Sequence, residues 1–179
     1  SLFLLVGLSS LSDAGDCNQR GDLDVRYCDA NGDLLADPPS DSSQWLDPGT
    51  LIFSYTAVED PSVYENVFSE LMEHIAKKTG KRVKWYGPES YAAQVEAMRS
   101  GRLHVSGFAA GATVYGVNLG GFHPVAMMGN KDGTFRGYKL WLITHKDSDI
   151  KTVKDLKGRK IAHVTPSSNS GNQAPRALF

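Results

Sequence analysis

Five small polar side chains crowd one short turn near the end of the sequence. They lie in the stretch TPSSNSGNQAPRALF, just before an expected helix, and are Thr165, Ser167, Ser168, Asn169 and Ser170. Residues of these types cap helices and form turns, but one or two would suffice for that purpose. The amino end of a helix also attracts anions, because its peptide dipoles add about half a positive charge there. The turn is therefore either a helix cap or an anion-binding turn.

The segment before the turn bears on this choice. KIAHV (160–164) predicts a strand that leads directly into the turn. Folds that alternate strands and helices hold ligands at the carboxyl ends of strands, where a turn opens the next helix. The order strand, turn, helix therefore favours the anion interpretation.

The chain from Leu51 onward has the pattern of such a fold. Three short apolar runs, LIFSY, RVKWY and LHVSGF, predict strands, and two helical segments connect them. Asp60 caps the first helix and Gly80 ends it; Ser90 caps the second and Gly101 ends it. Strands that alternate with helices through short connections form parallel sheets covered on both faces. The sequence predicts an α/β fold with three layers.

The first helix, expected over 63–78, has an apolar face made of Val63, Val67, Leu71 and Ile75. We expect Val67 and Leu71 to be buried against the sheet, because residues four apart share one side of a helix.

Further along, a short helix is expected at 113–118. FHPVAMMG then predicts a fourth strand near Val125, and GYKLWLITH a crossover strand over 138–145. TVKDLKG predicts another short helix. These elements would complete one lobe and begin a second.

The amino-terminal part has a different character. Residues 1–15 contain the apolar run LFLLVG and are interpreted as the remnant of a secretory signal peptide, with a buried helix as the other reading. Export to an oxidising compartment favours a disulfide between Cys17 and Cys28 over two free thiols. Residues 16–50 are polar and Pro-rich, which predicts an extended, loosely ordered arm. Within it, DANGDLLAD offers oxygen ligands for calcium, but the misplaced glycine favours a solvated cluster of Asx turns.

Composition excludes several classes of function. The formal net charge of -1 offers no field for binding nucleic acid or an anionic membrane. The five histidines are scattered without a metal-binding pattern, and no nucleophile elbow or phosphate-binding loop occurs. We expect neither an enzyme nor a bound metal or cofactor.

The order of segments from Leu51 to the end resembles a known family. It is similar to the phosphate, phosphite and phosphonate solute-binding proteins of bacterial ABC transporters, which are type II periplasmic binding proteins. The pieces that carry the resemblance are ESYAAQVEAMRSGRLHVSGF, GVNLGGFHPVAMMG and GYKLWLITHKDSDIKTVKDLKGRKIAHVTPSSNSGNQAPRALF. The last is the most specific, because a Lys-Asp-Ser turn, a DLKG helix and a Ser/Asn-rich turn follow the tyrosine-bearing strand in that order.

The resemblance implies a function. A protein of this kind captures phosphite, phosphonate or phosphate in a cleft between two lobes and delivers it to a membrane permease. It works in the periplasm, without a cofactor, without nucleic acid and without membrane insertion of its own once the signal is removed. A periplasmic oxyanion sensor that signals to a membrane histidine kinase is the main alternative, and an enzyme of unknown class is a lesser one.

The resemblance also implies binding residues. Ser168 and Asn169, flanked by Ser167 and Ser170, match the turn that holds the oxyanion in the family. Tyr91 and Tyr138 match tyrosines whose neutral hydroxyls donate to the ligand. Topology, rather than resemblance, adds four residues at the ends of strands, namely Tyr55, Thr56, Phe108 and Thr113.

Because the family has two lobes, the chain is expected to be a fragment of a longer protein, truncated at both ends. The segments are the signal remnant (1–15), the polar arm (16–50), an incomplete first lobe (51–137), and the crossover with the start of the second lobe (138–179).

Overall fold

Three parallel strands form the sheet in the structure, a computed structural model that describes residues 17, 19–56 and 60–179. They are β1 (Thr50–Tyr55), β2 (Arg82–Trp85) and β3 (Val105–Gly107), in the order β2-β1-β3. Phe53 of the central strand pairs with Trp85 on one side and with Val105 on the other. The strands predicted near Leu51, Val83 and Val105 are thus confirmed. The expected signal segment, 1–15, lies outside the described residues.

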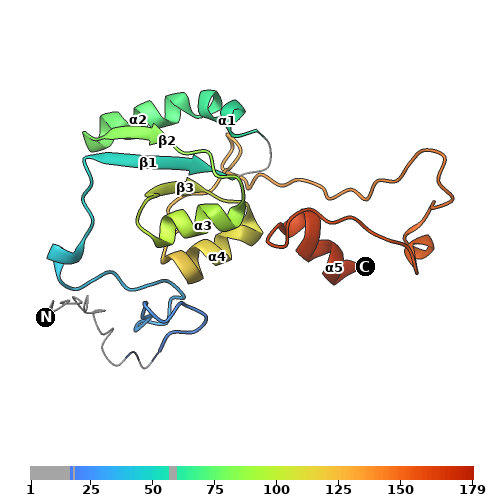
Figure 1. Cartoon of the computed structure of the whole chain (residues 1–179), viewed down its shortest axis with the longest axis horizontal. Helices are drawn as coiled ribbons and strands as arrows, with labels where there is room; N and C mark the ends of the chain where they lie inside the picture. The colour runs from blue at the N-terminus through green and yellow to red at the C-terminus, as the bar shows by residue number, and fades with distance from the viewer. Residues whose placement is uncertain (1–16, 18, 57–59) are drawn as a thin grey trace, which may run out of the picture.

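Helices cover both faces of the sheet (Figure 1). α1 (Pro61–Val67) and α2 (Ser69–Thr79) lie on one face, and α3 (Tyr91–Arg99) and α4 (Ala110–Gly120) lie on the other. The helix ends follow from the sequence: the Asp60 carboxylate accepts the Ser62 amide hydrogen, and Gly80 ends α2 in the left-handed region at φ 69°. The predicted three-layer α/β arrangement is confirmed.

Aromatic rings fill the space between the sheet and α1–α2. Phe68 stacks with Trp85 at a centroid distance of 6.4 Å and lies 5.6 Å from Phe53. On the opposite face, the core forms around Ala97, Met98 and Leu103, all at most 4% exposed. Both layers bury apolar area against β1, which is why this strand is the centre of the domain.

The expectation that Val67 and Leu71 are buried against the sheet is wrong. Their side chains are 66% and 43% exposed. The helix is interrupted at Phe68, where φ is -99° and ψ is 6°, and the ring of Phe68 turns toward the sheet. An aromatic ring buries more area than Val or Leu, so the face that contains Phe68 packs inward and the neighbouring aliphatic face is left outside.

The strands predicted after residue 121 are also absent. Over 122–164 the only β contact is an isolated antiparallel bridge between Gly129 and Phe135, and Val125 and Ile143 are 91% and 92% exposed. Figure 1 shows this stretch as a long excursion that leaves the sheet and comes back to α5 at the C-terminus of the chain. A strand needs a continuous hydrogen-bonding neighbour, and among the described residues these segments have only single backbone contacts, such as the Val164 amide to the Gly171 carbonyl at 2.9 Å. The predicted strands FHPVAMMG, GYKLWLITH and KIAHV therefore do not form here.

Several short helical turns punctuate the carboxyl-terminal part. TVKDLKG contains a 3-10 helix at Val153–Leu156, as its pattern predicts. The Ser/Asn-rich turn opens a π-helical turn, Asn169–Gln173, which continues into α5 (Ala174–Leu178). The short helix expected at 113–118 is longer and is α4, Ala110–Gly120.

The amino-terminal segment contains little regular structure, but it is fastened to the lobe. A disulfide joins Cys17 to Cys28, and their Cα atoms are 5.6 Å apart. The Asp24 amide donates to the Asn118 carbonyl at 2.7 Å, and the Arg26 guanidinium donates to the Leu119 carbonyl at 3.0 Å. The segment therefore covers the carboxyl end of α4, whose last carbonyls have no partner within the helix.

The DANGDLLAD loop within this segment is a cluster of Asx turns, as its pattern predicts, but its first carboxylate is buried and not solvated. Asp29 is 2% exposed, and its carboxylate accepts the amide hydrogens of Asp33 and Leu34, both at 3.0 Å. Asp37 accepts the Ala30 amide hydrogen at 2.7 Å. The carboxylates are thus used by the backbone of the loop itself.

Candidate functional site

Thr56, the residue after β1, links two strand ends. Its side chain is 3% exposed, and its hydroxyl donates to the Gly107 carbonyl at 3.2 Å and accepts the Ala109 amide hydrogen at 2.8 Å. Gly107 ends β3, and Ala109 is the residue before α4. Thr56 therefore fixes the entry into α4, and its one hydroxyl hydrogen is already used.

A buried glutamine holds the same strand end from the other side. Gln94 on α3 is fully buried, and its amide nitrogen donates to the Gly107 carbonyl at 3.1 Å and to the Ser106 hydroxyl at 2.6 Å. The turn between β3 and α4 is thus held by Thr56 and Gln94 together. Sequence reasoning missed Gln94, although a lone amide on the buried face of YAAQVEAM is a signal of such a role.

Tyr91 lies beside Thr56 at the start of α3. It is 4% exposed, and its N-terminal neighbour Ser90 caps the helix by accepting the Ala93 amide hydrogen at 3.1 Å. Burial raises the pKa of the Tyr91 phenol, and the neighbouring Thr56 side chain partly offsets this. The nearby phenols of Tyr138 and Tyr55 raise that pKa further. Tyr91 is therefore a protonated, neutral hydroxyl at physiological pH.

The amino end of α4 carries free backbone donors. Within the part of the chain that the structure describes, the amide hydrogens of Ala110 and Gly111 have no acceptor, because the capping residue is Ala109, which lacks a side-chain oxygen. The helix dipole adds positive potential at this point. Sequence reasoning missed these donors, because it placed the start of this helix three residues later.

The Ser/Asn-rich turn touches α4 at this same end. A Cβ atom added to Gly111 would lie 2.8 Å from the Ser167 carbonyl oxygen and 2.9 Å from the Asn169 amide nitrogen. Gly111 is buried, and only glycine permits so close an approach of the two backbones. The contact brings residues 110–111 and 167–169, which are far apart in the sequence, into one place.

Within the turn, the polar side chains have different tasks. Ser168 is a helix cap, since its hydroxyl oxygen accepts the Gly171 amide hydrogen at 3.1 Å. Ser170 accepts a hydrogen bond from the Tyr138 hydroxyl at 3.2 Å. The side chains of Ser167 and Asn169 make no hydrogen bond with any described residue, and the buried Thr165 hydroxyl also lacks a partner among them. The turn therefore supplies both a cap and unused polar groups.

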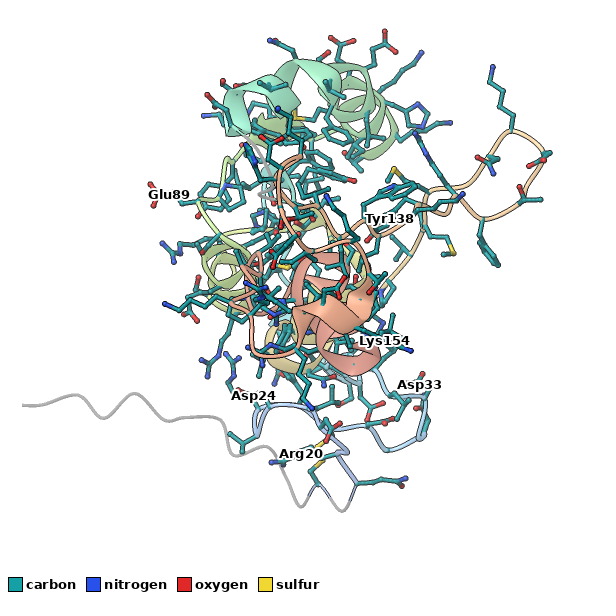
Figure 2. The ribbon with its side chains drawn as sticks, turned by 90° about the vertical axis from the view of Figure 1, so that its right-hand side faces the viewer. Arg20, Asp24, Asp33, Glu89, Tyr138 and Lys154 are labelled. Atoms are coloured by element: carbon teal, nitrogen blue, oxygen red, sulfur yellow. A yellow bond between two sulfur atoms is a disulfide. The ribbon has the colours of Figure 1, made fainter. Side chains whose placement is uncertain are left out.

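These contacts form a chain from β1 to the long excursion. The Thr56 hydroxyl accepts the Ala109 amide hydrogen at the start of α4, and α4 touches the Ser167–Asn169 turn. Ser170 of this turn accepts a hydrogen bond from Tyr138. Tyr138 lies on the long excursion (Figure 2) and is 71% exposed. No charged side chain takes part in any of these hydrogen bonds.

Three of the residues predicted by topology have packing roles. The Tyr55 ring lies 4.5 Å from the Phe68 ring, within the aromatic layer. Phe108 packs against the core around Met98 and lies over Gly116, where an added Cβ would be 3.2 Å from its ring. Thr113 donates its hydroxyl to the Ala109 carbonyl at 3.2 Å, within its own helix. Phe108 makes none of the hydrogen bonds that link Thr56, Ala109, Ser170 and Tyr138, and Thr113 reaches them only through the Ala109 carbonyl.

The described residues contain no group of three His, Cys, Asp or Glu side chains that would hold a metal ion. In the same residues, no helix has both the length and the apolar character needed to cross a membrane.

Comparison with known proteins bears on this arrangement. Residues 53–179 match the family described as ABC transporter, phosphonate, periplasmic substrate-binding protein. Over 144 residues the chain is 28% identical to Phosphate-import protein PhnD of Mycolicibacterium smegmatis, an alignment that covers 79% of this chain and 45% of the relative. It is also similar in structure to a crystallised binding protein component of an ABC phosphonate transporter from Pseudomonas aeruginosa, with a TM-score of 0.56 and 20% identity.

That structural match covers 74% of this chain and 45% of the solved one. The chain thus spans a little under half the length of the relatives that it matches. The shared fold confirms the predicted periplasmic-binding-protein class.

Proposed function

Because the chain belongs to the family of periplasmic substrate-binding proteins of phosphonate ABC transporters, we propose that it forms part of a solute-binding protein for phosphorus oxyanions. The ligand class is phosphite, phosphonate or phosphate, held where the first lobe meets the Ser/Asn-rich turn. The whole protein works outside the cytoplasm and delivers the anion to a permease in the membrane. It performs no chemistry on the ligand and needs no cofactor.

One observation carries this proposal: free donors from two distant segments lie close together. The unpaired amides of Ala110 and Gly111 lie at the amino end of α4, directly against the turn that bears Ser167 and Asn169. Anions bind where backbone amide hydrogens and a helix dipole point to the same spot. A plain helix cap would need only Ser168, which already accepts the Gly171 amide hydrogen.

The tyrosines would complete the site with neutral donors. Tyr138 gives its hydrogen to Ser170, a partner that an oxyanion can replace without breaking any element of the fold. Tyr91 remains a neutral phenol because burial raises its pKa. Thr56 belongs to the support of the site, since its hydroxyl hydrogen is held by Gly107.

The number of donors suits useful affinity. A hydrogen bond to a charged ligand contributes about 1.5 to 3 kcal/mol, so roughly three to five of them reach the ~8 kcal/mol of micromolar binding. The amides of Ala110 and Gly111, the side chains of Ser167 and Asn169, and the Tyr138 hydroxyl supply that number. Because none is a full charge, affinity should depend only weakly on ionic strength.

Isothermal titration calorimetry of the 179-residue chain with phosphite, phosphate, methylphosphonate and sulfate tests the proposal. We expect at least one phosphorus anion to bind more tightly than millimolar and more tightly than sulfate. Dissociation constants in the millimolar range or weaker for every phosphorus anion would contradict the proposal.

A further inference from the structure

A hollow lies between the amino-terminal segment and α4. It has a volume of about 330 Å³ and is lined by residues 20–34 on one side and by residues 110–118 on the other. Sites for small molecules have volumes of about 300 to 1,000 Å³, so this hollow is at the lower end of that range. Figure 2 shows Arg20 on the amino-terminal segment, well apart from Tyr138 of the oxyanion site.

The walls of the hollow are largely apolar. Leu23, which is 7% exposed, contributes from the amino-terminal segment, and Val114 and Val117 contribute from α4. The hollow exists because the segment is held at a fixed place on the helix by the bond from the Asp24 amide to the Asn118 carbonyl. An apolar group placed there would be removed from water on two sides.

Two side chains of opposite charge also line the hollow. Arg20 and Asp22 both line the hollow, and neither makes an ion pair with any residue that the structure describes. The Arg20 Nε atom is buried and has no hydrogen-bond acceptor among the described residues. A carboxylate that enters the hollow would pair with the Arg20 guanidinium, whose charge no described residue neutralises.

The local backbone explains why both side chains reach the same hollow. The Leu23 amide donates to the Arg20 carbonyl at 3.1 Å, which closes a tight turn over residues 20–23. Gly21 has a φ of 54°, a left-handed conformation that glycine adopts at little cost. The turn presents Arg20, Asp22 and Leu23 together, and Asn118 lines the hollow from α4.

We propose that this hollow binds a small zwitterion with an apolar side chain, of the chemical class of the aliphatic α-amino acids. The carboxylate would accept hydrogen bonds from Arg20 and the Asn118 amide, and the ammonium group would pair with Asp22. The aliphatic side chain would lie against Leu23, Val114 and Val117. A simple anion satisfies Arg20 but leaves Asp22 repelling it, so a ligand with both charges fits the lining best.

Titration of the 179-residue chain with L-leucine, followed by ¹H–¹⁵N NMR, tests this inference. We expect saturable shifts at amides of residues 20–23 and 114–118. Three analogues separate the contributions: 4-methylpentanoate lacks the ammonium group, 3-methylbutylamine lacks the carboxylate, and glycine lacks the aliphatic side chain. Each should bind at least about ten-fold more weakly than leucine.

Variants assign the effect to the hollow. Arg20→Gln and Asp22→Asn should each weaken leucine binding about ten-fold or more, whereas Arg102→Gln, at an exposed arginine outside the hollow, should leave it unchanged. Val114→Phe, at a position that is 56% exposed, fills the hollow from the surface and should abolish binding without unfolding the chain.

Leucine binding weaker than about 10 mM, equal binding of all four probes, or binding that survives both Arg20→Gln and Val114→Phe would each overturn the inference. Ala110 lines the hollow and also belongs to the proposed oxyanion site, but none of these substitutions removes its amide, so the titration with phosphorus anions should be the same in all these variants. The two proposals therefore fail or succeed separately.

Discussion

The Tyr138 hydroxyl donates a hydrogen bond to the Ser170 hydroxyl at 3.2 Å, across 32 residues of sequence. The contact links the outgoing part of the long excursion to the turn at its return. The Tyr138 ring is 71% exposed, so this hydrogen bond, rather than packing, defines where the side chain lies. A ligand that replaces Ser170 as the acceptor would gain a donor without a large rearrangement.

Tyr138→Phe should therefore weaken binding of the preferred phosphorus anion about ten-fold or more, since one hydrogen bond to the anion is lost while the ring remains. The urea midpoint of the chain should hardly change. Calorimetry and urea unfolding measure the two effects. Tyr115→Phe, at a tyrosine that is 40% exposed on α4, is the matched control and should alter neither. Equal anion affinity in Tyr138→Phe and the control would remove Tyr138 from the site.

Asn169 and Ser168 should respond differently to substitution. Ser168→Ala removes the acceptor of the Gly171 amide hydrogen and should destabilise the terminal helical turn, by about 1 kcal/mol for a typical cap. Asn169→Ala breaks no hydrogen bond within the described residues, so it should lower anion affinity and leave helix stability as it is. Circular dichroism and calorimetry on both variants separate the two roles. If Asn169→Ala keeps full affinity, the turn serves only as a cap.

Thr56→Val should lower the free energy of unfolding by about 1 to 3 kcal/mol, because the Ala109 amide and the Gly107 carbonyl each lose a buried partner. Valine keeps the shape of threonine, so lost packing does not confuse the result. Thr113→Val is the comparison, since its hydroxyl only bonds a carbonyl of its own helix. A urea series on both variants gives the difference. Equal losses would mean that Thr56 does not hold the entry into α4.

The ion pairs of Asp24 should make stability depend on pH in the acid range. The side-chain hydrogen bond from Arg26 lowers the pKa of the Asp24 carboxyl, and the charges of Arg26 and Arg99 act in the same direction. A lowered pKa in the folded state means that this contribution is fully present above the ordinary Asp pKa of about 3.9 and is lost as the pH falls below it.

The measurement is the urea midpoint of the wild type and of Asp24→Asn between about pH 7 and pH 3. The wild type should be the more stable at neutral pH, and the difference should shrink at the acid end. Glu73→Gln, which removes an exposed carboxylate that makes no ion pair or hydrogen bond within the described residues, serves as the control. A difference between wild type and Asp24→Asn that stays constant with pH would show that the ion pairs contribute nothing.

The elements that local sequence determines were predictable. Runs such as LIFSY combine β-branched and aromatic residues, and the capping residues Asp60, Ser90 and Gly80 lie where the helices begin or end. What failed depends on distant partners. Val67 and Leu71 have the right spacing for an inward face, but the break at Phe68 selects the aromatic face instead.

The site shows the same division. The type and spacing of Ser167, Ser168 and Asn169 pointed to an anion turn, and that can be read locally. The contact of this turn with Gly111 depends on how two segments far apart in the chain fold back on each other, and no local pattern encodes it. Thr56 is similar, because its bonds to Gly107 and Ala109 follow from the pairing of β1 with β3.

The close approach at Gly111 also determines what genetic variation this position tolerates. Every single-base change in a glycine codon that alters the amino acid introduces a residue with a Cβ atom, or else a stop codon. At Gly111 that atom would meet backbone, not a movable side chain, at 2.8 and 2.9 Å. No missense change is therefore neutral at Gly111. Gly133 is exposed and has nothing within 4 Å of an added Cβ, but its φ of +82° disfavours any residue with a side chain. In a library of random variants, depletion at codon 111 would report on contact between the turn and α4 even if no ligand were supplied.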